Sequence, residues 1–154
     1  NNIIYVEQEN KELGYVGKPK RVDAKLLREI IKEDFIPVIV PMGLDEKGIA
    51  YNINADTAAG AIARSIKSRR LMLLTDIDGV LDDNEKLISE INTTEAKELI
   101  NRETIHGGMI PKVKTCIDAI NNGVRAVVIL DGRKSHSILF ELFSDKGSGT
   151  LIRK

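Results

Sequence analysis

Residues 104–114, with the sequence TIHGGMIPKVK, form the segment around which the rest of the chain is organised. Gly107 and Gly108 let the backbone approach a ligand closely or adopt a positive φ, and Pro111 suits a first helical turn because its missing N–H needs no partner there. Backbone donors at a helix start, followed by the cation of Lys112, suit phosphate oxygens. An ordinary tight turn explains the glycine pair equally well on local grounds, so the interpretation depends on the flanking sequence.

Strand and helix patterns alternate on both sides of this segment. Downstream, a helix is predicted from Pro111 to Asn122, closed by Gly123, and residues 124–130 form an apolar strand. Upstream, residues 71–74 form a continuous apolar run before Thr75 and Asp76, which is typical of a parallel strand buried on both faces. Asn92 and Glu95 have capping-box spacing for a helix from about Thr93 to Asn101.

The N-terminal third shows weaker versions of the same alternation. Residues 3–6 and 13–17 resemble short strands or hairpin arms, and Asp23 is placed to cap a helix. Residues 35–40, FIPVIV, predict a buried strand, although Pro37 argues against a regular central one. A helix is predicted from Asn54 or Asp56 to about Lys67.

At the other end of the chain, Ser135 is placed to cap a last short helix. Ile138, Leu139, Leu142 and Phe143 would form its apolar residues, and a final strand follows within residues 147–152.

This order of elements predicts an α/β fold, a three-layer αβα sandwich with a mostly parallel sheet. Ligands of such sheets bind at the carboxyl ends of the strands. The loops at 52–56, 75–81 and 131–133 each follow a predicted strand. We therefore expect them to converge on one edge of the sheet, with the glycine-pair loop closing over them.

Composition narrows the function classes. The 154 residues carry 23 basic and 23 acidic side chains, so no basic surplus points to nucleic acid or to an anionic membrane. Cys116 is the single cysteine, and the two histidines lack acidic companions at ligand spacing, so no metal site is predicted. No apolar run approaches the ~20 residues of a membrane span. A reducing, cytoplasm-like compartment fits these features, and the strand-like start without Met suggests the middle of a longer protein.

Several polar residues lie where chemistry would be placed. Asn52 and Asn54 project alike from an extended segment and can hold a carboxylate or amide substrate. Asp56 is either a site residue or an acid favoured by the helix dipole, and Lys112 is either a phosphate ligand or a solvated helix lysine. Asp76, at the end of a buried strand, is the better site candidate. We expect Cys116 to serve packing and His106 to shape the loop.

Residues 73–81, LLTDIDGVL, resemble the first motif of the haloacid-dehalogenase-type phosphatases. That resemblance implies Asp76 as nucleophile and Asp78 as the proton-handling acid. Such an enzyme also needs a Ser or Thr after a later strand and a late acidic pair. Asp131 stands where the hydroxyl is expected and no late acidic pair follows, so the phosphatase is the weaker hypothesis.

A more extensive resemblance is to the acetylglutamate kinases, a branch of the amino-acid kinase family. Five segments are similar to its blocks in order and spacing, from about residue 13 to the end: LGYVG (13–17), NINAD (52–56), LTDIDGVLD (74–82), GGMIPKV (107–113) and DGR (131–133). The resemblance implies an amino-acid kinase-like fold with its N-terminal part missing. Residues 1–51 would be a remnant of the substrate-binding lobe, and residues 52–154 the nucleotide-binding lobe.

The implied activity is ATP-dependent phosphorylation of the side-chain carboxylate of N-acetyl-L-glutamate in arginine biosynthesis. By this resemblance Asn52 and Asn54 bind the substrate, and Asp56 and Lys112 are catalytic, Asp56 orienting catalytic lysines and Lys112 neutralising the transferring phosphoryl group. Mg²⁺ would arrive with ATP rather than in a protein cage. The residues that would hold the nucleotide are Thr75, Asp76, Gly79, Leu81, Met109 and Ile110.

The C-terminal segment is similar to that of the arginine-inhibited members. The resemblance assigns L-arginine binding to His136, Glu141 and Gly149, and a carboxylate facing a guanidinium makes physical sense. A surface glutamate on a terminal helix is the alternative. The complete enzyme is expected to be a homo-oligomer in the cytoplasm, or in an organelle stroma in a eukaryote.

These residues contain no counterpart of the family's N-terminal features. Those features are an opening strand with a phosphate-binding lysine, a glycine-rich turn, and a second glycine loop. Activity of the chain alone should therefore be very low, and residues 3–6 and 35–40 would lack sheet neighbours unless another chain supplies them. A non-catalytic nucleotide- or arginine-binding fragment remains an alternative.

Overall fold

The computed structural model describes residues 2–154 and divides the chain into two compact units. Unit 1 ends at Ser68 and unit 2 begins at Arg69. The predicted boundary between residues 51 and 52 therefore falls inside unit 1. The reason is that Ala58, from the helix that follows this boundary, is buried in the same core as Tyr51.

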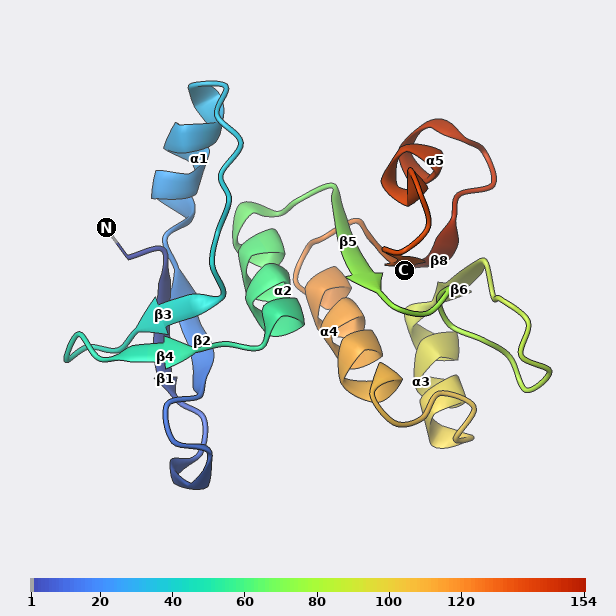
Figure 1. Ribbon diagram of the computed structural model, residues 1–154, viewed down its shortest axis with the longest axis horizontal. Helices are drawn as coiled ribbons and strands as arrows, with labels where there is room; N and C mark the ends of the chain where they lie inside the picture. The colour runs from blue at the N-terminus through green and yellow to red at the C-terminus, as the bar shows by residue number, and fades with distance from the viewer. Residues whose placement is uncertain (1) are drawn as a thin grey trace. The chain divides into compact units, whose positions relative to one another are not determined.

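Unit 1 contains a mixed four-stranded sheet in the order β2-β1-β3-β4 (Figure 1). The β1–β2 and β3–β4 pairs are antiparallel and the β1–β3 pair is parallel. A hairpin is therefore present near the start, but its second arm begins at Gly17 instead of covering the predicted residues 13–17, and a short 3-10 helix lies in its loop. The elements are β1 (Ile4–Gln8), the 3-10 helix (Lys11–Leu13), β2 (Gly17–Val22), β3 (Met42–Leu44) and β4 (Ala50–Asn52).

Two capped helices complete unit 1, α1 (Ala24–Lys32) and α2 (Ala55–Ile66). The Asp23 side chain accepts a hydrogen bond from the N–H of Leu26, as its position predicted. Asn54 caps α2 by accepting from the N–H of Thr57. The core of the unit consists of Ile4, Val6, Tyr51, Ile53 and Ala58.

The strand predicted at residues 35–40 is wrong. These residues form no strand, and Ile36 and Val38 are 90% and 93% exposed, while Ile39 packs against the core. Pro37 cannot donate to a ladder. Within the described part of unit 1, no strand lies beside this segment to pair with it, so its apolar character alone does not make it a strand.

Unit 2 contains the sheet β5-β7-β8-β6. The β5–β7 and β6–β8 ladders are parallel and β7–β8 is antiparallel. Helices α3 and α4 lie on one side of this sheet and α5 on the other (Figure 1), which confirms the α/β class with three layers. The strands are β5 (Arg70–Thr75), β6 (Glu90–Asn92), β7 (Ala126–Asp131) and β8 (Gly149–Arg153).

The helices α3 (Thr93–Asn101) and α4 (Met109–Asn121) follow the sequence closely. Asn92 and Glu95 form the predicted capping box. Helix α4 begins at Met109 rather than at Pro111, so the proline lies later in the first turn, where its missing N–H still costs no hydrogen bond. None of the helices in residues 2–154 is long and apolar enough to cross a membrane.

Strand β5 is only partly covered, contrary to the prediction of burial on both faces. Leu71 and Leu73 are buried, whereas Leu74 is exposed. The reason is its position, because β5 is the edge strand of its sheet and, among residues 2–154, only β7 pairs with it.

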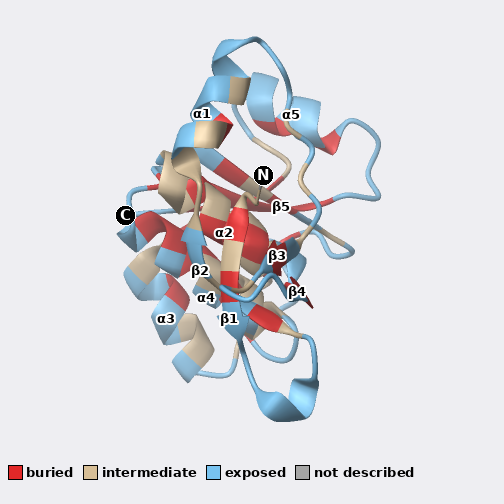
Figure 2. Cartoon of the chain, turned by 90° about the vertical axis from the view of Figure 1, so that its left-hand side faces the viewer, coloured by how far each residue is buried: buried red, intermediate tan, exposed pale blue. Residues whose placement is uncertain are grey.

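Helix α5 (Ser137–Phe143) differs most from expectation. Ser135 does not cap it, since His136, with φ of 61°, occupies the N-cap without a side-chain cap bond. Its apolar residues are exposed, up to 82% for Phe143, and its buried residues are Ser137 and Glu141 (Figure 2). The apolar spacing correctly predicted a helix, but the face that packs inward is polar.

Candidate functional site

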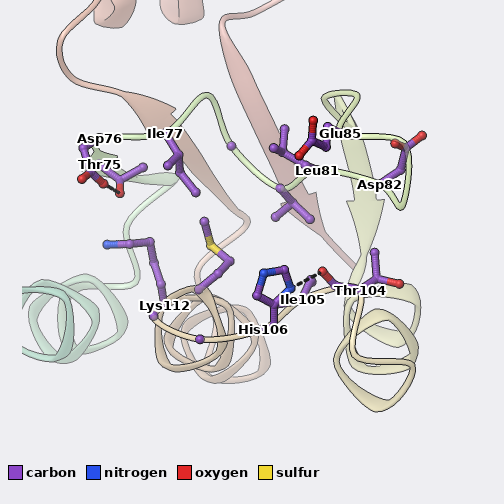
Figure 3. Close-up of a pocket in the computed structure, with 15 residues that line it drawn as sticks. Thr75, Asp76, Ile77, Leu81, Asp82, Glu85, Thr104, Ile105, His106 and Lys112 are labelled. Atoms are coloured by element: carbon purple, nitrogen blue, oxygen red, sulfur yellow. Dashed lines mark hydrogen bonds between the residues drawn. The ribbon is translucent and has the colours of Figure 1, made fainter.

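A cavity of about 640 Å³ opens in unit 2 where the loop after β5 faces the loop before α4 (Figure 3). We call it the strand-end cavity. Residues from 75 to 85 line one side, and residues 104–109 with Lys112 line the other. Of the predicted nucleotide-binding residues, Ile110 does not line it, and those that do are Thr75, Asp76, Gly79, Leu81 and Met109.

Neighbouring parallel strands bring the ends of β5 and β7 together. Thr75 pairs in register with Asp131, and the N–H of Gly132 donates to the carbonyl of Thr75 at 2.8 Å. Further along, Lys134 Nζ lies 2.8 Å from Asp78 Oδ1. The loops at 75–81 and 131–133 are therefore adjacent, as the strand order predicted for this part of the edge.

Asp131 is a structural carboxylate rather than an open acid. Its side chain is 4% exposed and accepts from the Nε, the Nη2 and the backbone N–H of Arg133, each at 2.9 Å. These hydrogen bonds from Arg133 lower the pKa of Asp131 from 3.8 to about 2. The hydrogen bond to Asp131 is the main reason that the pKa of Arg133 is raised, and the nearby charges of Asp76 and Asp78 act in the same direction. Both charges are thus held in place beside the cavity.

Gly79 is required by close packing. Its φ is 151°, and a Cβ there would lie 2.6 Å from Thr150 Oγ1 and 2.8 Å from Leu87 Cδ1. The Thr150 hydroxyl accepts from the N–H of Val80 at 2.8 Å and donates to the carbonyl of Ile88 at 2.7 Å. Strand β8 therefore fixes the backbone of the loop that forms one wall of the cavity.

The glycine pair has two different roles. Gly107 adopts φ of 55°, which favours glycine, whereas Gly108 has an ordinary helical φ of −66°. A Cβ at either position would meet nothing within 4 Å. Since neither conformation nor packing demands glycine at 108, the missing side chain leaves the backbone open to a ligand.

The amides of Met109 and Ile110 are already used. They donate to the carbonyls of His106 and Gly107, at 3.2 and 3.3 Å. Among residues 2–154, no backbone acceptor takes a hydrogen bond from the amides of Gly107 or Gly108. The backbone donors available to an anion here are thus those of the glycine pair, and Lys112 lies in the first turn of α4 beside them (Figure 3).

Two acids on the cavity lining were missed from the sequence, Asp82 and Glu85. Asp82 closes a turn by accepting from the N–H groups of Asn84 and Lys86, and these two bonds lower its pKa. Leu81 and Leu87 bridge across the turn. The turn-forming residues 82–86, between Leu81 and Leu87, are the sequence signal that predicts this turn.

The substrate-side candidates belong to unit 1. Asn52 and Asn54 are both exposed and flank the buried Ile53, which agrees with their expected projection to one side of an extended segment. Asn54 also has a structural role as the cap of α2. Asp56 lies in the first turn of that helix, where the dipole favours an acid.

A second pocket, of about 480 Å³, surrounds Glu141 in unit 2, and we call it the Glu141 pocket. Glu141 and Gly149 line it, but His136 does not. One Glu141 oxygen faces the Arg70 guanidinium at 3.3 Å, and the other accepts from the N–H of Ser148 at 3.1 Å. Within residues 2–154 no group of three or more His, Cys, Asp or Glu side chains is arranged to hold a metal ion.

Comparisons with known proteins place these features in a family context. The model of the Amino acid kinase family matches residues 2–131. Acetylglutamate kinase from Pelagibacter ubique is 61% identical over all 154 residues, which cover 54% of that protein. Acetylglutamate kinase from Rhodopseudomonas palustris is 52% identical over 143 residues, 93% of this chain and 48% of that protein. The chain therefore spans about half the length of the curated relatives it matches.

Solved structures agree on the fold. N-acetylglutamate synthase from Neisseria gonorrhoeae, complexed with coenzyme A and L-arginine, matches the whole chain with a TM-score of 0.91 and 26% identity, over 37% of that protein. Carbamate kinase from Giardia lamblia bound to AMP-PNP matches 97% of the chain and 51% of that protein with a TM-score of 0.70. At 19% identity, this second match supports the fold alone.

Proposed function

Since this chain belongs to the amino acid kinase family, we propose that it is the C-terminal part of an acetylglutamate kinase. The reaction is transfer of the terminal phosphoryl group of ATP to the side-chain carboxylate of N-acetyl-L-glutamate. The 61% identity to the Pelagibacter ubique enzyme supports this substrate over those of more distant family members. Because the chain spans about half of that relative, the complete activity requires the remaining part.

The observation that carries the proposal is the strand-end cavity. Three features of different origin meet there: the loop from Thr75 to Leu81, the open backbone of the glycine pair, and Lys112. Phosphoryl transfer needs alignment and compensation of negative charge more than covalent chemistry. Backbone donors and one lysine supply both.

Adenosine triphosphate fits the residues present. The open backbone at Gly108 and the amides of the pair suit phosphate oxygens, and Thr75 adds a hydroxyl. We propose that Thr75, Asp76, Gly79, Leu81 and Met109 hold the nucleotide, with Ile110 supporting the start of α4 from outside the cavity lining. Mg²⁺ would arrive with the nucleotide.

The substrate side is assigned to unit 1. We propose that Asn52 and Asn54 bind N-acetyl-L-glutamate and that Asp56 orients the catalytic lysines. In this proposal the substrate lobe corresponds to unit 1, which includes α2, and the nucleotide lobe to unit 2. The complete protein would be a homo-oligomer of the cytoplasm or of an organelle stroma.

Arginine regulation is the second part of the proposal. Glu141 and Gly149 line one pocket, and the Neisseria gonorrhoeae synthase, similar over the whole chain, was solved with L-arginine. A buried carboxylate is a suitable partner for a guanidinium. His136 lies outside the pocket lining, so its role would be to set the start of α5 through its left-handed backbone.

The family assignment leaves no support for the phosphatase hypothesis. A non-catalytic nucleotide- or arginine-binding fragment remains the second candidate, because the chain covers only about half of its relatives. The two differ in one outcome, turnover when the missing part is supplied.

A segment replacement tests the proposal. The matched segment of the Pelagibacter ubique acetylglutamate kinase would be replaced by this chain, and acyl phosphate formation would be measured with ATP and N-acetyl-L-glutamate. L-aspartate, L-glutamate and carbamate would be assayed in parallel. We expect turnover with N-acetyl-L-glutamate well above the other three. A folded chimera that binds ATP without turnover would favour the non-catalytic fragment instead.

A further inference from the structure

Helix α5 buries an acid where an apolar side chain is expected. Ser137 and Glu141 are one helical turn apart and both face inward, while the apolar residues between and after them are exposed. The Glu141 side chain is 7% exposed. Burying a carboxylate is unfavourable unless charged or hydrogen-bonding partners surround it, so this position needs a reason beyond packing.

The structure supplies the partners of this carboxylate from two segments. Arg70 Nη1, from the edge strand β5, lies 3.3 Å from Glu141 Oε1 and 3.4 Å from the Glu141 carbonyl oxygen. The N–H of Ser148 donates to Oε2 at 3.1 Å, and the Ser148 hydroxyl donates to the carbonyl of Ser137 at 2.8 Å. The carboxylate is thus oriented by the backbone on one side and paired with a guanidinium on the other.

Glycines shape the chain around this carboxylate. A Cβ at Gly147, where φ is 66°, would lie 2.6 Å from Glu141 Oε2. A Cβ at Gly149 would lie 2.1 Å from the carbonyl oxygen of Ile129. Neither position tolerates a side chain without movement, so the segment that donates to Glu141 is held close to it.

The two partners differ in exposure. The Arg70 side chain is 38% exposed, against 7% for Glu141, and both line the pocket of about 480 Å³. The acid is therefore enclosed by its neighbours, whereas the guanidinium that faces it can be reached from solvent.

We propose that Arg70 is an internal competitor for Glu141, so that free L-arginine binds by displacing the Arg70 guanidinium. This inference rests on the proposed arginine site and adds its control element. The pair keeps the buried carboxylate satisfied when no ligand is present. It also lowers the apparent affinity for arginine by the fraction of molecules in which Arg70 is paired.

A guanidinium rather than any cation is the expected ligand. One nitrogen, Arg70 Nη1, contacts both the carboxylate and the carbonyl oxygen of Glu141. A free guanidinium can add a second, parallel contact to the carboxylate, which an ammonium cannot. L-lysine should therefore displace Arg70 poorly, while agmatine, which retains the guanidinium, should still bind.

Calorimetric titration of the 154-residue chain with L-arginine tests this. Arg70→Gln should lower the dissociation constant about fivefold, because the competitor is gone while the ligand's partner remains. Arg69→Gln is the matched control, since Arg69 is the neighbouring exposed arginine, and it should bind as the parent does. Glu141→Gln should weaken binding, and adding Arg70→Gln to it should bring no recovery.

Unchanged or weaker binding in Arg70→Gln would overturn the proposal. If that variant fails to fold, Arg70→Lys decides, because it keeps the charge but loses the fork and should still bind arginine more tightly than the parent. Absence of binding in the parent and in Arg70→Gln alike would remove both the arginine site and this inference. That result would leave the kinase proposal intact, since phosphoryl transfer by the chimera tests it separately.

Discussion

The strand-end cavity and the Glu141 pocket, both in unit 2, solve opposite problems. The cavity is formed by loops, with open backbone at Gly108 and a lysine on the adjoining helix. The pocket contains a buried carboxylate that is already paired with Arg70. In the strand-end cavity, the backbone donors can be hydrated by solvent when no polyanionic ligand is bound. A buried acid needs a partner even without a ligand, because its desolvation would cost several kcal/mol. The first site is therefore built for addition of a ligand and the second for exchange.

The largest expected effect would come from Lys112→Met in the chimera. Charge compensation in the transition state is lost, so turnover should fall about 100-fold or more, with little change in the KM for ATP. Steady-state kinetics measure both constants. Lys114→Met, two residues further along α4 and exposed, is the control and should retain activity. Undiminished turnover in Lys112→Met would show that this lysine does not take part in phosphoryl transfer. It would also weaken the contrast between ligand addition in the strand-end cavity and ligand exchange in the Glu141 pocket.

Gly79→Ala tests how firmly strand β8 fixes the cavity wall. The new Cβ would overlap Thr150 Oγ1, and φ of 151° disfavours any L residue, so the free energy of unfolding should fall by about 2–3 kcal/mol. Urea denaturation of the chain measures this. Gly108→Ala is the control, because its φ is ordinary and its Cβ would meet nothing within 4 Å. Equal stability of the two variants would mean that the wall is looser than its packing indicates.

The Asp131–Arg133 pair is a paired carboxylate beside the strand-end cavity. The acid titration of Asp131 can be followed through the stability of the protein. Since the pKa of Asp131 is lowered from 3.8 to about 2, its stabilisation is complete above about pH 4 and is lost as the pH falls towards 2. Asp131→Asn should therefore lower stability at neutral pH and flatten the dependence between pH 4 and 2. Thermal unfolding across this range measures the effect. Arg133→Gln should flatten the same range, and an unchanged profile in both would contradict the assignment.

The smallest effect is expected from Lys134→Gln, which breaks the ion pair with Asp78 beside the cavity. Both side chains are about half exposed, so the pair should contribute at most about 1 kcal/mol. Screening should remove even that difference at about 1 M salt. Denaturation at low and high salt measures it. A larger, salt-independent loss would contradict the weak, screened contribution expected of this pair.

Local rules predicted much of unit 2. Asn92 and Glu95 form the expected capping box, and Asp23 caps α1 in unit 1 as expected, because such caps depend only on residues three apart. The loops after β5 and β7 also meet as expected, since parallel neighbours end at the same edge. The third predicted loop, 52–56, follows a strand of the other sheet, so the expected single edge was wrong. Of the predicted nucleotide residues, those of the β5 loop line one cavity because they belong to one short loop.

Predictions that depended on a neighbouring element were less successful. Residues 35–40 have the apolar content of a strand but no partner within the described part of unit 1. The exposure of Leu74 followed from the edge position of β5, and the roles of Asp82 and Glu85 followed from a turn that folds back on the cavity. The missing strand partner and the edge position are not encoded within a few residues, whereas the turn at Asp82 is.

The amino-acid sequence alone determined the alternation of elements, the caps, and the glycine-pair loop before a lysine-bearing helix, because periodicity and capping act over one or two turns of chain. The tertiary structure decided which of those residues share a site. It placed Arg70 against Glu141 across 71 residues of sequence, and it turned the polar side of α5 inward. Burial of a charge depends on a partner's position in space, and no local pattern specifies that position.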